Sequence, residues 1–534
     1  MKRNAVVLFL LSTVALAGVW AAGLFGAEAA VRRRPNTSVR IRVLNINIFY
    51  GGDEINLTSG NWCSHPDGCA ETLDKVVETI RSADPDIVEL EEAERNTRVI
   101  AERLGWYYSE RMQILSRFPL IDPPGGDSVY IFVVLAPGRI AALANVHLPA
   151  DPYGPYWVQD GATLEEVLAL EKSLRLPAIQ DQLRLLPPLV ARGIPVFLAG
   201  DFNSPSHLDW TPEVDAVREE VRYPVVWPVS LALANAGFRD SYRVVHPDPV
   251  AKPGFTWTPG GLESIPNEFH DRIDWILYAG AARPVQSQIA GEAGGPDVDI
   301  ATDPYPTDHR GVVTTFDVIP AEAPILVAVE DRRLEVGDEL PVVFHASGRA
   351  RERVAIVPAG GSTVDAVAER PTAGAVDGRL VFSTARLAPA AYEAALIDDA
   401  GAIVSRSPFW LYAPGTPAIV TTAKSEYRPG EDIRVSWANA PGMRWDWLGI
   451  YKPGDSDGSP QATSCDTYNC GGNQRYLVYE YTRATIEGTT AFTAASAPGW
   501  VTWPLGPGMY EIRLLLDDGY RSIAASEPFR IVGP

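Results

Sequence analysis

Carboxylate, amide and imidazole side chains recur where apolar runs of the first 318 residues end or are interrupted. Asp201 and Asn203, for example, follow the run VFLAG, and His147 ends ALANVH. The full set is Asn47, Glu92, His147, Asp201, Asn203, Asp274, Asp308 and His309. Carboxylate and amide oxygens bind hard divalent cations, and carboxylates and imidazoles transfer protons. The pattern therefore predicts a site for cation binding and proton transfer at the ends of strands.

Taken one at a time, these residues have structural explanations. Asp201 and Asn203 are typical turn residues, and Asn47 is explained as a hydrogen-bonded amide in the core. Glu92 stands in the acidic run ELEEAE, which is typical of a solvated helix start. Asp274 interrupts the apolar run RIDWIL, where a buried carboxylate needs a donor such as an imidazole. Their recurrence from strand to strand favours a common site.

The elements that must position these side chains are short strands alternating with helices. Six runs have the composition of strands: VRIRVLNINIF, DIVELEEA, RIAALANVHL, IPVFLAGDF, RIDWILY and GVVTTFDVI. Helical spacing of apolar residues marks residues 69–84 and 162–193. This alternation predicts a layered α/β domain over residues 39–318, with its chemistry at the strand ends.

In this order the segments resemble the endonuclease/exonuclease/phosphatase superfamily, which includes apurinic endonucleases, pancreatic-type deoxyribonucleases and neutral sphingomyelinases. The resemblance covers about residues 40–318. It rests on LNINIFYGG, PDIVELEE, ILSRFPL, NVHL, GDFNSPS, DSYR with GFTW, RIDWIL and TDHRG. It implies a two-layer α/β sandwich that hydrolyses phosphoric esters with a divalent metal ion.

The resemblance also implies the metal site. The family usually has Leu-Gln-Glu where this chain has Leu90-Glu91-Glu92, so the metal-binding carboxylate is expected at Glu92. Asn47 and Asp308 are expected to complete a site for Mg²⁺ or Mn²⁺, ions that take oxygen ligands. Such an ion would polarise a phosphoryl oxygen and neutralise developing charge.

The remaining side chains have implied catalytic roles. Asp201 is expected to orient or deprotonate the attacking water, and Asn203 to fix Asp201 and the phosphate. His309, oriented by Asp274, and His147 are expected to donate hydrogen bonds to phosphoryl oxygens. The implied reaction is an in-line displacement that depends on positioning and electrostatics, without a covalent intermediate.

The sequence leaves the substrate open, because this fold serves many phosphate esters. Tyr156 and Trp157 could stack on bases or enter a lipid interface, or pack on the scaffold. Arg117 in SRFPL could contact phosphate or position a loop. We expect a phosphodiesterase acting on nucleic acid or phospholipid. The alternatives are a phosphomonoesterase for a soluble organic phosphate and a binding protein on a degenerate nuclease fold, and the complete residue set favours an enzyme.

Composition limits how nucleic acid could be bound. The 534 residues carry a formal net charge of −21, with ordinary globular hydrophobicity. This charge disfavours binding through a broad basic surface, where phosphate contacts supply most of the affinity. It leaves room for an enzyme that engages a few phosphates in a metal-containing cleft.

Residues 320–414 and 416–534 form an internal repeat of β-rich sequence. LAPAAYEAALIDDAGAIVSRSPFWLYAP in the first copy corresponds to LGPGMYEIRLLLDDGYRSIAASEPFRIVGP in the second, each with an Asp-Asp turn. The pattern predicts two immunoglobulin-like β-sandwiches after the α/β domain. The two sandwiches could bind a surface or polymer ligand.

The first 30 residues predict export. They combine a basic start, a long apolar stretch and an Ala-Glu-Ala site, which is typical of a signal peptide. The apolar stretch is also long enough for an uncleaved membrane anchor. We expect a secreted, periplasmic or cell-surface protein. Accordingly the four cysteines are expected to form two local disulfides, Cys63–Cys69 and Cys465–Cys470, since neither pair has a second cysteine pair or a suitable histidine partner nearby.

Overall fold

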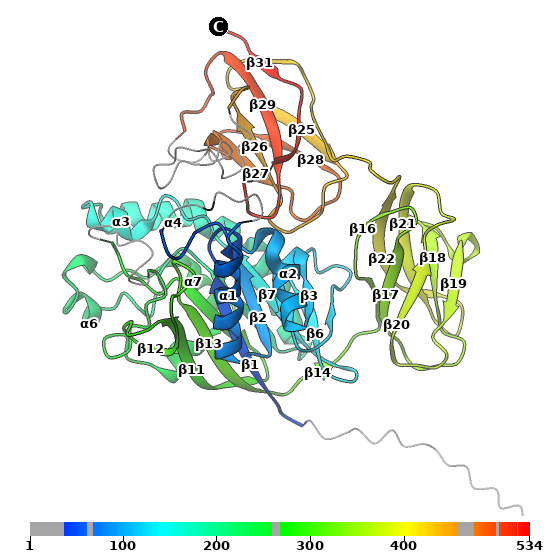
Figure 1. Ribbon diagram of the computed structural model, residues 1–534, viewed down its shortest axis with the longest axis horizontal. Coiled ribbons are helices and arrows are strands. Elements are labelled where there is room, and N and C mark those ends of the chain that lie inside the picture. Colours follow the sequence, from blue (N-terminus) through cyan, green and yellow to red (C-terminus); the bar gives the residue numbers. More distant parts are fainter. Residues whose placement is uncertain are drawn as a thin grey trace, which may run out of the picture. The chain divides into compact units, whose positions relative to one another are not determined.

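Two seven-stranded sheets form the centre of the α/β domain (Figure 1). The computed structural model describes residues 37–60, 63, 68–258, 268–455, 475–497, 501–520 and 522–533. The first sheet has the order β12 (Val298–Thr302), β11 (Ala282–Glu292), β13 (Gly311–Val318), β1 (Val39–Asn47), β2 (Ile87–Glu91), β4 (Ile114–Ser116) and β3 (Tyr107–Ser109). The second has the order β5 (Leu120–Ile121), β6 (Ile131–Ala136), β7 (Arg139–His147), β8 (Val196–Asp201), β10 (Asp274–Ala279) and β9 (Arg239–Asp240), with β14 (Ala321–Glu322) beside β7.

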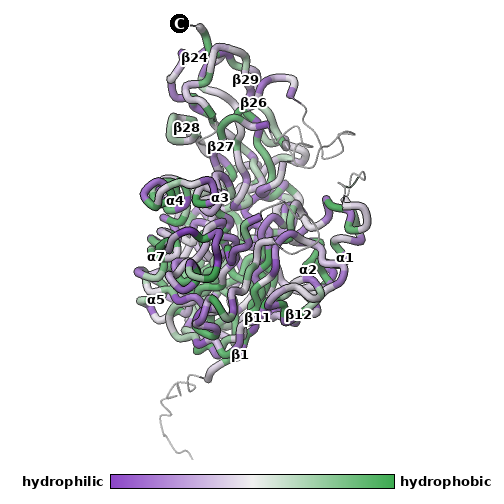
Figure 2. Tube along the Cα trace, turned by 90° about the vertical axis from the view of Figure 1, so that its left-hand side faces the viewer, coloured by the Kyte–Doolittle hydropathy of each residue, from purple (hydrophilic) through white to green (hydrophobic). Residues whose placement is uncertain are grey.

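The two sheets pack face to face, and helices cover their outer faces. Between the sheets, the rings of Phe197 and Phe316 lie 4.9 Å apart in a core that also contains Val43 and Ile276. α1 (Ala70–Ala83) and α2 (Thr97–Leu104) pack on the first sheet, and α5 (Gln180–Ala191) and α7 (Pro228–Asn235) on the second. Figure 2 shows these two helix pairs on opposite sides of the domain. The remaining helices are α3 (Gly154–Gln159), α4 (Leu164–Ala178), α6 (Pro212–Asp215) and α8 (Ser241–Val245), with 3₁₀ turns at Tyr50–Gly52, Glu94–Asn96, Glu110–Met112, Glu219–Val221 and Thr363–Asp365.

The predicted elements are confirmed, with differences at their ends. β8 is buried along its whole length, which explains its continuous apolar run. Asn47 ends β1 and Asp274 begins β10, so neither side chain interrupts a strand. The helical stretch 162–193 is two helices, because the backbone leaves the helical conformation at Ile179. β11 was not predicted, since its sequence ARPVQSQIAGE lacks a clear apolar alternation.

A buried ion cluster lies next to the start of β10, around Arg272. Arg272 has no exposed side-chain surface, and its Nη2 lies 2.8 Å from Asp209 Oδ2 and 2.6 Å from Asp240 Oδ2. Arg243 also donates from Nε to Asp209, at 2.5 Å. Asp240 in turn caps α8 by accepting two backbone N–H groups. The cluster therefore ties α8 to the loop that enters β10.

Arg272→Met is expected to lower the free energy of unfolding by about 3–5 kcal/mol, because it leaves two buried carboxylates without their shared cation. Chemical denaturation of the full chain would measure this loss. Arg283→Met is the control, since Arg283 is 71% exposed and pairs with Asp317 at the surface. Equal midpoints for the two variants would show that the buried cluster does not stabilise the domain.

Two β-sandwiches follow the α/β domain, as predicted, and each has its own core. The first pairs a sheet of β15 (Leu326–Val329), β17 (Glu339–His345) and β20 (Asp377–Ser383) with one of β16 (Arg333–Glu335), β22 (Ile403–Tyr412), β21 (Ala390–Ile397), β18 (Arg353–Pro358) and β19 (Ala368–Pro371). The second pairs β23 (Ile419–Thr422), β25 (Ile433–Ala438) and β28 (Gly488–Phe492) with β24 (Glu426–Tyr427), β31 (Phe529–Ile531), β29 (Gly508–Leu515), β26 (Trp447–Tyr451), β27 (Val478–Tyr481) and β30 (Ser522–Ala525). The immunoglobulin-like type stays a prediction.

The structure describes part of the sequence relevant to export. Cys63 and Cys69 form a disulfide, with their Cα atoms 5.7 Å apart. The signal segment 1–30 and the pair Cys465 and Cys470 lie outside the described residues. Among the helices that the structure describes, none combines the length and apolarity needed to cross a bilayer.

Candidate active site

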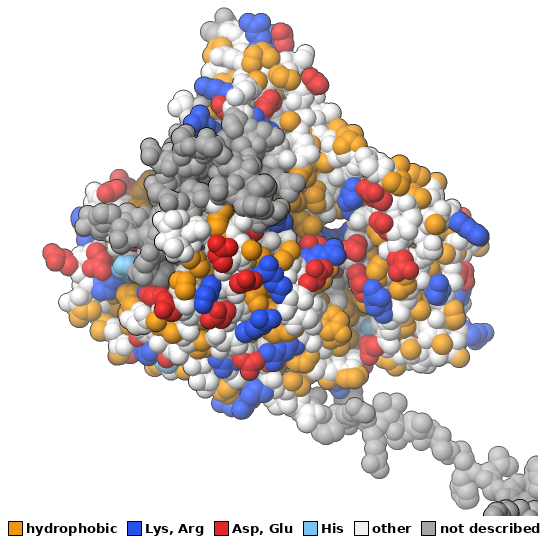
Figure 3. Space-filling model, viewed as in Figure 1, with side chains coloured by type: hydrophobic (Ala, Val, Ile, Leu, Met, Phe, Trp, Pro, Cys, Tyr) orange, Lys and Arg blue, Asp and Glu red, His pale blue; other side chains and the backbone are white. Residues whose placement is uncertain are grey.

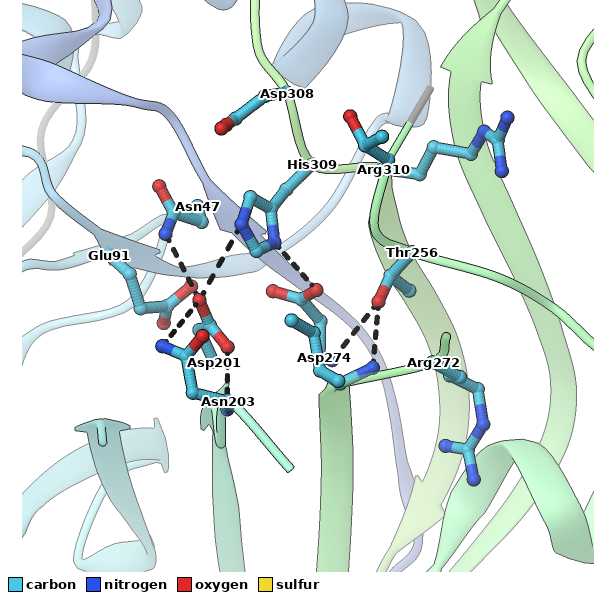
Figure 4. Close-up of polar contacts among 12 residues, drawn as sticks. Asn47, Glu91, Asp201, Asn203, Thr256, Arg272, Asp274, Asp308, His309 and Arg310 are labelled. Atoms are coloured by element: carbon cyan, nitrogen blue, oxygen red, sulfur yellow. Dashed lines mark hydrogen bonds and ion pairs between the residues drawn. The ribbon is translucent and has the colours of Figure 1, made fainter. Parts of the chain in front are cut away.

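Strand ends bring most of the predicted side chains together at one edge of the two sheets. In the second sheet, Asp201 at the end of β8 pairs with His147 of β7 on one side and Asp274 of β10 on the other. In the first sheet, Asn47 at the end of β1 pairs with Glu91 of β2. The pairs β7–β8 and β1–β2 are parallel, so the carboxyl ends of these strands meet at the same edge. Figure 4 shows side chains from both sheets converging there.

His309 lies between the carboxylates of Asp274 and Asp201, and these three side chains are called the carboxylate row below. Its Nδ1 lies 2.9 Å from Asp274 Oδ2, and its Nε2 lies 3.6 Å from Asp201 Oδ2 (Figure 4). The start of β10 is fixed because the backbone N–H of Asp274 donates to Thr256 Oγ1 at 3.1 Å. The hydrogen bond to Asp274 thus orients the His309 ring with Nε2 toward Asp201.

Asp201 is held by amide donors on both oxygens. Its Oδ1 accepts the backbone N–H of Asn203 at 2.8 Å, and its Oδ2 accepts the side-chain amides of Asn47 and Asn203, each at 3.2 Å. Asn203 has a φ of 47°, a left-handed conformation that asparagine tolerates better than most residues. Its amide also donates to the Leu148 carbonyl at 3.0 Å, which anchors the loop after β8 to the loop after β7.

The two adjacent glutamates occupy different environments. Glu92 Oε1 accepts the Asn47 amide at 3.0 Å, and Glu92 Oε2 accepts the Tyr50 backbone N–H at 2.9 Å. Glu91 is fully buried, with Oε2 3.3 Å from the Asn45 amide. Burial and the nearby carboxylates, Asp274 foremost, raise the pKa of Glu91 well above its usual range. Glu92 is therefore the glutamate bound to Asn47, and its metal-binding role stays a prediction.

His147 faces the same carboxylates from the other side. Its Nε2 lies 3.7 Å from Asp201 Oδ2 and 3.9 Å from Glu92 Oε1. Its Nδ1 is in contact with the carboxylate of Asp518, from the second β-sandwich. Burial disfavours the charged ring, but Asp518, followed by Asp201 and Glu92, raises the pKa of His147 to about 10. The raised pKa favours the protonated ring, which donates hydrogen bonds from both nitrogens.

The carboxylates of the site outnumber its cations. Burial raises the pKa of Asp201, and Asp274 adds to this, although His309 and His147 oppose it. Burial also raises the pKa of Asp308, where His309 opposes and Glu92 and Asp201 reinforce the shift. An oxygen-rich, electron-rich site of this kind fits a hard divalent cation.

Two sets of residues could hold that cation. Within the described part of the chain, Asp201, Asp274 and His309 offer ligand atoms that all lie within 4.8 Å of one another. That set is already joined by the hydrogen bonds given above. Near Asp308, the Thr307 hydroxyl lies 3.4 Å from Oδ1, but it donates its one proton to the Asn47 carbonyl at 2.8 Å. Glu92 already accepts two hydrogen bonds, and Asn47 directs its amide nitrogen to Glu92 and Asp201. Cation binding by Glu92 and Asp308 stays a prediction.

Sequence comparisons identify the family. Residues 47–309 match the model of the Endonuclease/Exonuclease/phosphatase family. The uncharacterised protein F14F9.5 of Caenorhabditis elegans is 30% identical over 312 residues, which cover 53% of this chain and 93% of that protein. The chain belongs to the endonuclease/exonuclease/phosphatase family. Because members of this family are generally hydrolases, we assign the chain as one of its hydrolases.

Solved structures of the family have low similarity to the chain. An endonuclease/exonuclease/phosphatase protein from Beutenbergia cavernae is 17% identical, covering 70% of this chain and 100% of that chain, with a TM-score of 0.32. D. rerio TDP2, solved with a single-strand DNA product, is 18% identical, covering 52% of this chain and 99% of that chain, with a TM-score of 0.31. Membership of the family rests on the sequence matches.

The predicted substrate-binding residues lie in separate surroundings. Arg117 Nη2 lies 2.5 Å from Asp84 Oδ1, and its guanidinium stacks over the Trp106 ring. Tyr156 donates its hydroxyl to Glu268 Oε1 at 2.6 Å, and Trp157 is 38% exposed. Neither the Arg117 nor the Tyr156 contact involves the carboxylate row. That Arg117, Tyr156 and Trp157 contact the substrate stays a prediction.

Sequence reasoning missed three contributors to the site. Thr256, in the GFTW segment, fixes Asp274, and Thr307 donates its hydroxyl to the Asn47 carbonyl at 2.8 Å. Both hydroxyls occur in motifs that the family resemblance already marked, so proximity to those motifs was a usable signal. Asp518 lies more than 200 residues beyond the last of these motifs, and its Asp-Asp turn occurs in both repeats. The sequence held no signal for its contact with His147.

Proposed function

We propose that the α/β domain hydrolyses phosphate esters by attack of water on phosphorus, with phosphodiesters of nucleic acid or phospholipid as the leading substrates. The observation that supports this most is the row Asp274–His309–Asp201, with Asn203 fixed against Asp201. Such a row offers a proton acceptor and hydrogen-bond donors within one small site. A degenerate binding protein would be expected to lack one of these groups.

Each side chain has a role in this reaction. Asp201 orients water and accepts its proton as the oxygen–phosphorus bond forms, while the bond from phosphorus to the leaving oxygen breaks in line. His309 Nε2 and His147 donate hydrogen bonds to phosphoryl oxygens, where negative charge accumulates. Asn203 keeps the Asp201 carboxylate from rotating, so that little reorganisation is needed.

A divalent cation would be held by Glu92 and Asp308, with Asn47 beside them. Mg²⁺ or Mn²⁺ at this position would supply neutralisation of the phosphoryl charge. The support is the excess of carboxylates over cations described above, including Asp308, whose pKa is raised by burial and further by the nearby Glu92.

Removal of divalent cations with EDTA is expected to abolish hydrolysis of bis(p-nitrophenyl) phosphate, and excess Mg²⁺ or Mn²⁺ should restore it. The Glu92→Gln variant should need a higher cation concentration for half-maximal rate, because the amide has lost the negative charge that attracts the ion. Glu102→Gln is the matched control, since Glu102 is 59% exposed and pairs with Arg98 on α2, away from the site. Full turnover in EDTA would exclude the metal-dependent mechanism.

The surface favours substrates held by few phosphates. On the face shown in Figure 3, acidic and basic side chains are interspersed over the α/β domain. With a net charge of −21, such a mixture gives little of the counterion release that drives extended binding to a duplex. We therefore propose that the substrate is gripped at and next to the scissile phosphate.

We also propose that the protein is exported through its N-terminal segment. The disulfide between Cys63 and Cys69 supports this, because disulfides persist in oxidising compartments. N-terminal sequencing of protein recovered outside the cytoplasm tests it. A mature chain starting near residue 30 is expected for cleavage, and an intact start in the membrane fraction for an anchor. Reduced, uncleaved protein confined to the cytoplasm would refute export.

A further inference from the structure

The turn between β29 and β30 of the second β-sandwich reaches the catalytic site. Asp518 in this turn contacts Nδ1 of His147, while Nε2 of the same ring faces Asp201 and Glu92. The side chains of Asp518 and His147 are only 12% and 15% exposed. The contact is therefore a largely desolvated one, where a charged hydrogen bond is strong.

The turn is held in shape by its own sandwich. The backbone N–H of Asp518 donates to the Trp445 carbonyl at 2.9 Å, and Trp447 Nε1 donates to the Gly519 carbonyl at 3.0 Å. The Tyr481 hydroxyl lies 3.4 Å from Asp518 Oδ1, so the other oxygen, Oδ2, is the one at His147. Asp518 has a φ of 66°, which fixes its side-chain direction through a left-handed backbone. The carboxylate is thus prepositioned.

Close contacts surround Asp518 on the α/β side. A Cβ added to Gly519 would lie 2.6 Å from Cδ of Glu94, so this glycine allows a close approach. The rings of Tyr520 and Tyr50 lie 6.0 Å apart, and Tyr50 follows the strand that carries Asn47. The approach of the turn is therefore shared by several residues and is not a single long-range ion pair.

A second, separate contact anchors the same sandwich. The backbone N–H of Arg444 donates to the Arg111 carbonyl at 3.1 Å, and the Arg444 guanidinium contacts the Ser128 carbonyl. Arg111 is 9% exposed and lies 3.3 Å from Asp122. Two anchoring regions restrain the sandwich better than one, and this helps to keep Asp518 at His147.

His147 and His309 have equivalent surroundings. Each ring uses Nδ1 for a carboxylate and directs Nε2 to Asp201. For His309 the orienting carboxylate is Asp274 from the same sheet, whereas for His147 it is Asp518 from another domain. In the first sandwich, Asp399 occupies the turn position that matches Asp518 and pairs with Arg351 of its own sandwich. The repeat alone does not impose the contact.

We propose that Asp518 is a positioning residue for His147, so that the second β-sandwich completes the active site of the α/β domain. This rests on the proposed hydrolysis. Asp518 keeps the imidazole ring oriented, with Nε2 toward the phosphoryl oxygens. In this proposal Asp518 does not contact the substrate, and its replacement lowers activity by changing the orientation of His147.

The test compares Asp518→Asn and Asp518→Ala with Asp399→Asn in the full chain, using bis(p-nitrophenyl) phosphate with Mg²⁺ or Mn²⁺. Orienting residues of this kind typically contribute about 10–100-fold. We expect kcat to fall by that factor in both Asp518 variants with little change in KM, and Asp399→Asn to retain the wild-type rate. In a His147→Ala background, Asp518→Ala should cause no further loss, because its effect passes through the ring.

A readout independent of turnover is the ¹H–¹⁵N spectrum of ¹⁵N-histidine-labelled protein. The His147 signals are assigned by their loss in His147→Ala, and we expect the downfield Nδ1–H signal to disappear in Asp518→Ala. An unchanged His147 spectrum with wild-type kcat would overturn the proposal. A raised kcat in the Asp518 variants would also overturn it, because the turn would then inhibit the site. If the wild type hydrolyses no ester, the proposed function fails, and the spectrum alone decides whether Asp518 orients His147.

Discussion

Replacing Asp201 by asparagine is expected to lower kcat by about 10²–10⁴-fold, the range that a positioned general base contributes. The amide keeps the shape of the carboxylate but cannot accept a proton from water. It also turns one oxygen into a donor that meets the Asn47 or Asn203 amide, both now on Asp201 Oδ2. Steady-state hydrolysis of bis(p-nitrophenyl) phosphate measures the loss, which should appear in kcat more than in KM.

The control for this variant is Asp181→Asn on α5. Asp181 is 46% exposed and pairs with Arg184 at the surface, so the change of net charge is matched without touching the site. Thermal unfolding of both variants shows whether the domain stays folded. A folded Asp201→Asn protein with the control's turnover would refute the role of Asp201 as base.

Replacing His309 by asparagine is expected to lower kcat by about 10²–10³-fold, as for the loss of one preorganised donor to the transition state. An asparagine amide can occupy the place of Nδ1 and keep a hydrogen bond to Asp274, now 2.9 Å long. It cannot reach the place of Nε2, 3.6 Å from Asp201 Oδ2. His309→Gln should retain more activity, because its longer amide reaches the Nε2 position.

His207→Asn serves as the matched control, since His207 lies in the same domain and bonds to Ser230 at 2.9 Å. We expect turnover to rank in the order control, His309→Gln, His309→Asn. The reverse order of the two His309 variants would mean that the ring acts through Asp274 and not through Nε2.

The convergence of Asp201, His147 and Asp274 could be anticipated from the sequence because it depends on strand ends. Apolar runs marked β7, β8 and β10, and polar residues at their ends had to converge once the strands were neighbours. The register that places Asp201 opposite both His147 and Asp274 depends on how the strands pair. It cannot be predicted from the sequence of one strand alone. β11 was missed because polar residues such as Gln286 and Gln288 alternate weakly with apolar ones.

Contacts between domains could not be predicted at all. Whether the Asp-Asp turn of a repeat points to solvent or to a neighbour depends on how two folded surfaces fit. Asp399 and Asp518 occupy matching sequence positions, yet one pairs with Arg351 and the other with His147. A contact that a distant segment makes with His147 is visible only in three dimensions.

The measurement that tests the central claim most directly is a substrate panel of supercoiled DNA, RNA, sphingomyelin and inositol phosphates. Each substrate is assayed with the wild type in Mg²⁺ or Mn²⁺, and in parallel with Asp201→Asn. We predict cation-dependent hydrolysis of at least one phosphodiester by the wild type, reduced at least about 10²-fold in the variant. Equal hydrolysis by the two proteins, or no hydrolysis of any member by the wild type, would contradict it.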